Sequence, residues 1–212
     1  MIFRASRLLA VLLLAILLAG GCATSPPSRF HTLSALPLAP GGAGDTGPAG
    51  AATAVPPLLI ALGPMRLPAY LDRPQVVTRQ SANRLAIDDF ERWGGSLQDD
   101  FARVWGQNLT ALPGGERLRI LPAESRETPD LRLTAEILAF EGQPDGQAVL
   151  RVRWSLLDPR RDRPLSVHEG QYARPLALPG DSEALVAALS AALGDFSRAV
   201  SEVLRGLPVD PG

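Results

Sequence analysis

The chain has one cysteine, Cys22, and the residues before it give that side chain a defined chemical use. Two arginines, Arg4 and Arg7, precede an apolar run over 8–18, and small residues (Ala-Gly-Gly) stand directly before the cysteine. A basic start, a short apolar segment and small residues at the cut are typical of a signal peptide. Lipoprotein signal peptidase cleaves before such a cysteine, whose thiol carries diacylglycerol while the new amino group takes a further acyl chain. We therefore predict a lipoprotein signal peptide over 1–21 and a covalent diacylglycerol and N-acyl anchor on Cys22.

An ordinary signal peptide followed by an incidental thiol is the alternative, but it would leave a lone reactive cysteine in a secreted chain. Two or three acyl chains anchor a protein firmly, because each buried methylene contributes about 0.8 kcal/mol. The residue after the cysteine is Ala23, whereas an aspartate at this place commonly retains Gram-negative lipoproteins in the inner membrane. We expect a lipid-anchored protein on the periplasmic face of the outer membrane.

The other residues that could do chemistry do not form a convincing catalytic set. Ser166 and His168 stand two apart in an expected strand, where alternate side chains share a face by default. The carboxylates of Asp88, Asp89 and Glu91 could supply the pair of a hydrolase, but a charged run beside a strand end is more typical of a solvated surface. We expect no enzymatic activity, and an envelope hydrolase is the weakest of the alternatives.

Metal, phosphate and nucleic-acid binding are likewise disfavoured. The chain has only two histidines, His31 and His168, so the three or four ligands of a zinc site are not at hand. The glycines at 41–47 lie in low-complexity sequence with no helix after them, unlike a phosphate-binding loop. With 21 basic and 22 acidic residues the formal net charge is −1, which gives no bulk attraction to nucleic acid. We expect no cofactor beyond the lipid on Cys22, and no nucleic-acid partner.

Two elements are predicted to be helices and eight to be strands. Ser96 with Asp99 three residues later fits a capping box, and apolar residues then recur at helical spacing as far as Leu112. Asp181 begins a second helix that ends at Gly206. Strict period-two alternation, or short apolar runs, predict strands at 29–33, 58–62, 75–79, 84–90, 117–121, 131–137, 148–156 and 165–176. This order favours a mixed α/β (α+β) fold, in which one mixed, largely antiparallel sheet is packed by two long helices.

Composition divides the mature chain into three parts. Residues 22–57 contain the lipidated N-terminus, a short strand and a linker rich in Ala, Gly and Pro, which is either a tether to the membrane or an insertion between two strands of one sheet. The folded domain is predicted at 58–207. A short tail follows at 208–212.

One stretch stands out for its aromatic, proline and arginine content. It reads Leu67-Pro-Ala-Tyr-Leu-Asp-Arg-Pro-Gln-Val-Val-Thr-Arg79 and is followed by an Asn at 83 and by Phe90-Glu-Arg-Trp93 before the first helix. Together with the cysteine motif and Phe30-His-Thr-Leu33, this pattern resembles the ABC-type transport auxiliary lipoproteins, the paraquat-inducible protein C (PqiC, or YmbA) family. The insertion at about 38–56 departs from that family's pattern.

The resemblance implies a non-catalytic role at the outer membrane. Such lipoproteins work with a mammalian-cell-entry (MCE) domain protein that spans the periplasm as a tube and moves phospholipid or other hydrophobic molecules between membranes. The resemblance also implies a mixed α/β fold and allows a homo-oligomeric ring of copies around the end of the tube. A regulator or scaffold of another envelope assembly, such as a cell-wall synthase or a secretion pore, is the alternative function.

Four residues of the distinctive stretch are of types that favour protein interfaces. These are Tyr70, Leu71, Arg73 and Trp93, which we predict to bind the partner. The alternative is that Tyr70 and Trp93 belong to the core while Asp72 and Arg73 cap a turn.

Overall fold

The computed structural model describes residues 26–37, 56–122, 125–160 and 164–207. The predicted signal peptide, Cys22, residues 38–55 of the Ala/Gly/Pro-rich segment and the tail at 208–212 lie outside the described residues. The predictions for those segments therefore rest on the sequence.

All eight predicted strands and both predicted helices are present among the described residues. In chain order the elements are β1 (Arg29–His31), β2 (Leu58–Arg66), β3 (Gln75–Ser81), β4 (Arg84–Trp93), α2 (Leu97–Ala111), the single 3-10 turn η1 (Gly115–Arg117), β5 (Leu118–Leu121), β6 (Leu131–Gly142), β7 (Gln147–Leu157), β8 (Pro164–Pro175) and α3 (Ser182–Arg205).

The predicted helix caps are confirmed. The Ser96 hydroxyl accepts a hydrogen bond from the Asp99 amide at 3.3 Å, and the Asp181 carboxylate accepts one from the Ala184 amide at 2.7 Å. Each bond satisfies an amide that the first turn of a helix leaves without a backbone partner.

Three predicted strand ends are too early: β4 continues past residue 90 to Trp93, β6 continues past residue 137 to Gly142, and β2 also continues. The sequence Gly63-Pro64 suggests that β2 stops at residue 62, but the strand continues to Arg66. Gly63 has a φ of 112°, and the register with β6 shifts between Leu62 and Met65. The glycine and proline therefore form an irregularity inside the strand, which then resumes its pairing.

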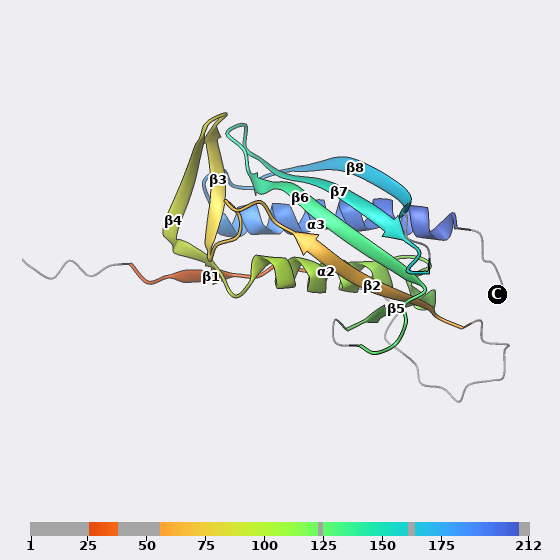
Figure 1. Ribbon diagram of the computed structural model, residues 1–212. Coiled ribbons are helices and arrows are strands. Elements are labelled where there is room, and N and C mark those ends of the chain that lie inside the picture. The colour runs from red at the N-terminus through yellow and green to blue at the C-terminus, as the bar shows by residue number, and fades with distance from the viewer. Residues whose placement is uncertain (1–25, 38–55, 123–124, 161–163, 208–212) are drawn as a thin grey trace, which may run out of the picture.

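The sheet is mixed, and two separate groups of strands adjoin the two ends of β6: β2 with β5 at one end, and β3 with β4 and β1 at the other. β6, β7 and β8 form an antiparallel meander, as predicted. The first half of β6 also pairs in parallel with β2, and β2 pairs with β5. The far end of β6 meets β3 through one residue pair, Thr78 with Gly142, and β3 continues to β4 and β1. The β3–β4 hairpin consequently stands apart from β2 and β5 (Figure 1).

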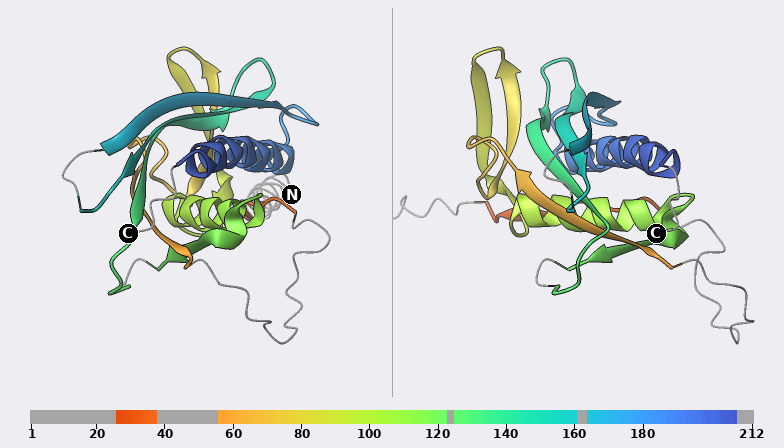
Figure 2. Two further views of the ribbon diagram at one scale, coloured as in Figure 1. Left: turned by 90° about the vertical axis from the view of Figure 1, so that its right-hand side faces the viewer. Right: turned by 45° about the vertical axis from the view of Figure 1, so that its right-hand side comes forward.

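The core lies between the sheet and the two helices, which run side by side along one face of it (Figure 2). Alternate residues of β6 and β7 point into this layer and are almost fully buried. Phe196 of α3 lies at the centre of an aromatic cluster: its ring centroid is 5.1 Å from that of Trp105 and 6.3 Å from those of Phe101 and Trp154. α3 is long and apolar enough to cross a membrane, but 67% of its most apolar window is buried, as befits a core helix.

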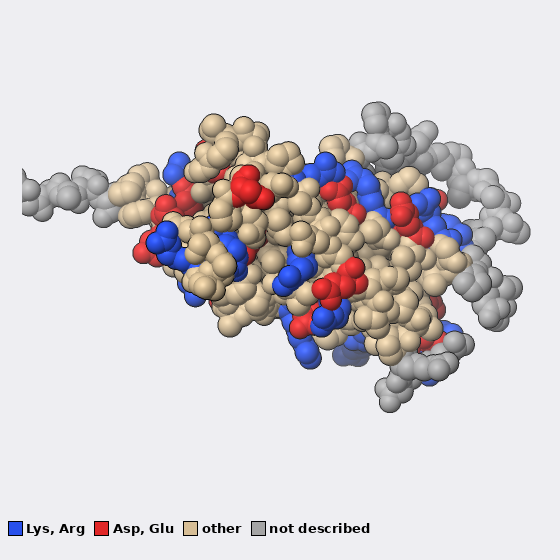
Figure 3. All heavy atoms as spheres, turned by 90° about the horizontal axis from the view of Figure 1, so that it is seen from above, with Lys and Arg blue, Asp and Glu red and all other residues tan. Residues whose placement is uncertain are grey.

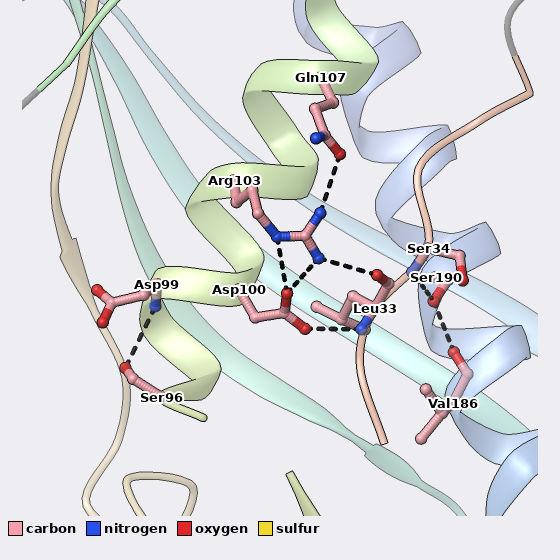
Figure 4. Close-up of polar contacts among 9 residues, drawn as sticks. All are labelled: Leu33, Ser34, Ser96, Asp99, Asp100, Arg103, Gln107, Val186 and Ser190. Carbon is pink, nitrogen blue, oxygen red and sulfur yellow. Dashed lines mark hydrogen bonds and ion pairs between the residues drawn. The ribbon is translucent and has the colours of Figure 1, made fainter. Parts of the chain in front are cut away.

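The chain after β1 is bound between α2 and α3 by side chains of both helices. The Leu33 amide donates to Asp100 Oδ2 at 2.6 Å, and the Ser34 amide to Ser190 Oγ at 3.1 Å (Figure 4). The Leu36 amide donates to Asn108 Oδ1 at 2.7 Å. β1 and β2 belong to one sheet, so residues 38–55 connect two parts of the same folded body, and residues 29–36 pack with the domain predicted at 58–207.

Candidate functional site

The distinctive stretch forms a tight connection between β2 and β3. The Leu71 and Asp72 amides both donate to the Pro68 carbonyl, at 2.9 and 3.3 Å. The Trp93 amide at the end of β4 donates to the Pro74 carbonyl at 2.7 Å. The connection is therefore fixed to the end of the β3–β4 hairpin by its own backbone.

The structure separates the four predicted partner-binding residues into two kinds. Leu71 is 2% exposed and Trp93 is 5% exposed, and the Trp93 ring is stacked on Phe140 with a centroid distance of 6.4 Å. Both side chains are parts of the core. For Trp93 this agrees with the alternative interpretation, a core residue, and not with a surface contact. Tyr70 and Arg73 are half-buried, so some of each side chain reaches the surface. Partner binding by these residues stays a prediction, and it now rests on Tyr70 and Arg73.

Tyr70 belongs to a buried polar cluster with Arg79 and Glu141. The Arg79 guanidinium lies 5.9 Å from the Tyr70 ring centroid, and its Nε forms a salt bridge with Glu141, which is 1% exposed. Gln143 Nε2 donates to the same Glu141 oxygen at 3.2 Å. Two strands, β3 and β6, and the connections that carry Tyr70 and Gln143 thus meet in one charged contact where β3 pairs with β6.

Burial and the neighbouring charges set the protonation states of Tyr70 and Arg79 in this cluster. Burial and the negative charge of Glu141 raise the pKa of Tyr70 from 10.0 to about 12, with Arg79 opposing. The hydrogen bond to Glu141 raises the pKa of Arg79. At neutral pH the cluster therefore holds a neutral phenol beside a cation.

The cluster retains unused hydrogen-bonding capacity. Among the described residues, the Tyr70 hydroxyl and Glu141 Oε2 of this cluster are buried polar atoms without a hydrogen-bond partner, and Arg73 Nε in the β2–β3 connection is another. An unsatisfied buried polar atom costs roughly 1–3 kcal/mol. These atoms are closed to solvent, so a polar group of a partner would reach them only if neighbouring side chains moved.

An open cleft of about 360 Å³ adjoins the cluster. It lies where the sheet divides, between β3, β4, the β6–β7 turn and the start of α3. Polar groups from Arg79, Asp88 and Asp181 share its walls with the apolar side chains of Val76 and Leu185. This volume is near the lower limit for pockets that bind small molecules. The cleft is therefore better suited to an inserted side chain than to a whole phospholipid.

The three carboxylates considered for catalysis are engaged in separate contacts. Asp88 accepts from the Phe90 amide at 2.8 Å, and Asp89 from Gln75 at 3.1 Å. Glu91 is 4% exposed, forms an ion pair with Arg29 and is hydrogen-bonded to His31. The three side chains therefore do not form a hydrolase pair.

Ser166 and His168 do share a face of β8, as expected for alternate strand residues. His168 Nε2 lies 3.0 Å from Ser166 Oγ, and its ring is stacked on Trp154 at a centroid distance of 4.3 Å. No acidic side chain is hydrogen-bonded to His168 within the part of the chain that the structure describes. The same described residues contain no group of three or more His, Cys, Asp or Glu side chains arranged to hold a metal ion.

The sequence matches the family model of the ABC-type transport auxiliary lipoprotein component over residues 43–201. That match covers most of the 212 residues and includes the cluster, the cleft, α2 and most of α3. The chain belongs to this family. No curated protein matches the sequence.

Solved structures show that this auxiliary lipoprotein shares its fold with distant relatives. An uncharacterised protein is 16% identical with a TM-score of 0.66, covering 84% of this chain and 99% of its own. A protein from Xanthomonas campestris is 18% identical with a TM-score of 0.59, covering 73% of this chain and 89% of its own. At such identities the likeness shows the fold alone.

Glu141 is the residue of the auxiliary lipoprotein's cluster that sequence reasoning missed. In the alternation of β6 an acidic residue after Phe140 is expected to face solvent. The register of β6 with β7 shifts between Ile137 and Ala139, so that Phe140 lies opposite Leu150 on the core face, and Glu141 lies opposite Val149 on the other face. Glu141 is nevertheless buried there, where Arg79 and Gln143 contact its carboxylate. A run of buried residues at Phe140, Glu141 and Gly142 marks this change. The only sequence signal was Arg79, a charged residue within the family stretch.

Proposed function

We propose that this ABC-type transport auxiliary lipoprotein is the outer-membrane-anchored accessory subunit of an MCE-type system that moves lipid or other hydrophobic molecules between membranes. In this role it is a non-enzymatic docking adaptor for the periplasm-spanning MCE protein. The family match over 43–201 is the observation that carries the proposal. Lipid on Cys22 attaches the domain to the membrane, and Ala23 at the second mature position is compatible with the outer membrane.

The geometry supports an adaptor more than a carrier of lipid. The cleft holds about 360 Å³, is open, and is walled partly by charged side chains. A second described pocket, between β2 and the segment after β5, holds about 290 Å³. Neither suits the sequestration of acyl chains from water. A protein side chain inserted into the cleft, by contrast, would meet the charged side chains of Arg79, Asp88 and Asp181.

The proposal includes a ring of copies around the end of the tube. Among the described residues β8 pairs with β7 alone, so the other edge of this twelve-residue strand is open to another chain. Long open edges are sites of pairing between chains unless they are protected. Native mass spectrometry of the lipoprotein in detergent would show a defined multimer if the ring forms, and a monomer if it does not.

Crosslinking in the cell's own envelope, with mass spectrometry of the captured proteins, tests the partner. We expect the full-length lipoprotein to recover an MCE-domain protein. Recovery of a cell-wall synthase or a secretion channel, without an MCE protein, would overturn the adaptor role and favour a regulator or scaffold of another envelope assembly.

A further inference from the structure

Phe30 is the most exposed large apolar side chain among the described residues, at 67%. It lies on β1, a three-residue edge strand at one end of the molecule (Figure 1). Its cross-strand neighbour is Arg92 of β4, and burial alternates from Phe90 to Trp93, so that Phe90 and Arg92 face away from the core. Phe30, Phe90 and Arg92 therefore form one outward surface, which we name the β1–β4 edge.

This edge is rigidly attached to the body. The buried Glu91 carboxylate binds Arg29 and also His31, whose Nε2 lies 2.6 Å from Glu91 Oε2. Beyond β1 the chain is held between the helices through the Leu33 and Leu36 amides. Phe30 cannot retract into the core without breaking these contacts. Its ring stays in water unless another surface covers it, which is unfavourable for apolar area.

The predicted lipid lies close to this edge along the chain. Seven residue steps separate Cys22 from Arg29. A fully extended chain spans at most about 3.6 Å per residue, so β1 lies within about 25 Å of the lipidated residue. The chain that leads to the membrane therefore enters the domain at the β1–β4 edge.

We infer that the β1–β4 edge is a membrane-contacting surface that rests on the bilayer carrying the lipid anchor. This inference rests on the lipidation of Cys22 in the proposed function. Apolar side chains such as phenylalanine on a membrane-facing surface insert at the boundary between headgroups and acyl chains, which places Phe30 and Phe90 there. The guanidinium group of Arg92, the cross-strand neighbour of Phe30, meets lipid phosphates at the same level. The domain is thereby oriented on the membrane with its opposite end toward the periplasm.

Single-cysteine labelling of the lipidated full-length protein tests the orientation. Cys22 is the only native cysteine and is acylated, so Phe30→Cys introduces the one reactive thiol. The matched control is Val167→Cys on β8, where the native side chain is 57% exposed. Each protein is incorporated into vesicles of phosphatidylethanolamine and phosphatidylglycerol, collected by flotation, and reacted with a membrane-impermeant maleimide.

The reference for each position is the same variant with Cys22→Ser, in solution and without lipid. We expect the thiol at position 30 to react about tenfold more slowly on vesicles than in solution, and the thiol at 167 to change by less than about twofold, because only the former enters the interface. Proteins that float but keep their solution rate at position 30 would refute the surface and leave the anchor standing. Failure to float would refute both.

A second copy of the chain is the other occupant that this edge could have. In that case position 30 would be protected in the lipid-free protein at high concentration, and dilution would restore its reactivity. That result would overturn the membrane assignment.

Discussion

Tyr70 is the residue whose chemistry differs most from its behaviour in water. Burial and the nearby Glu141 charge raise its pKa from 10.0 to about 12. Since the folded protein holds this proton more tightly, the corresponding stabilisation is complete below pH 10 and is lost as the pH rises through about 12. In the Tyr172→Phe variant Tyr70 is the only tyrosine. Its ultraviolet tyrosinate signal should show about a tenth ionised at pH 11, against about nine tenths for a free phenol.

Two controls assign that titration to the cluster. Glu141→Gln removes one of the causes, so the Tyr70 midpoint should fall toward the ordinary value. Circular dichroism at each pH identifies the range in which the protein is still folded. A midpoint near 10 in the folded Tyr172→Phe protein would contradict the buried arrangement of Tyr70, Arg79 and Glu141.

At the scale of elements, the segment at 33–36 makes the two helices depend on the N-terminal chain. Asn108 is fully buried: its Oδ1 accepts from the Leu36 amide, and its Nδ2 donates to Ser197 Oγ at 3.2 Å. Asn108→Ala leaves a buried amide without a partner and should lower the free energy of unfolding by about 2–3 kcal/mol. Thermal or denaturant unfolding measures the change.

The matched control stands one residue earlier in α2. Gln107 is exposed and contacts Arg103 on the helix surface (Figure 4). Gln107→Ala should change the free energy of unfolding by less than about 0.5 kcal/mol. Equal effects of the two substitutions would show that residues 33–36 are not bound between the helices in solution.

The elements were predictable where one local rule decided the structure. Period-two alternation located β6 and β7, and Ser96 and Asp181 marked the helix starts, because capping and alternation depend on near neighbours in the sequence. The division of the sheet at the pair of Thr78 with Gly142 depends on contacts between distant segments. The site was accordingly predicted in part: Tyr70 and Arg73 reach the surface, while Trp93 is in the core and Glu141 was missed.

At the scale of the whole molecule, the formal net charge is too small to give a bulk attraction to a charged partner. Acidic and basic side chains are intermixed on the face shown in Figure 3, in keeping with a formal net charge of −1. Specificity must then come from local contacts, such as the cleft and the polar cluster beside it, and from the membrane anchor, which raises the local concentration of the domain.

We propose that this lipoprotein docks directly on an MCE-domain protein, and a binding measurement with the two purified proteins tests this role. Arg73→Ala removes a half-buried side chain of the predicted contact, and Arg151→Ala, on the exposed side of β7, is the matched control. We predict measurable binding by the unaltered lipoprotein and by Arg151→Ala, and at least about tenfold weaker binding by a folded Arg73→Ala, as expected for a buried arginine contact. Absence of binding by the unaltered lipoprotein would contradict the adaptor role, and equal binding by all three proteins would place the docking surface elsewhere.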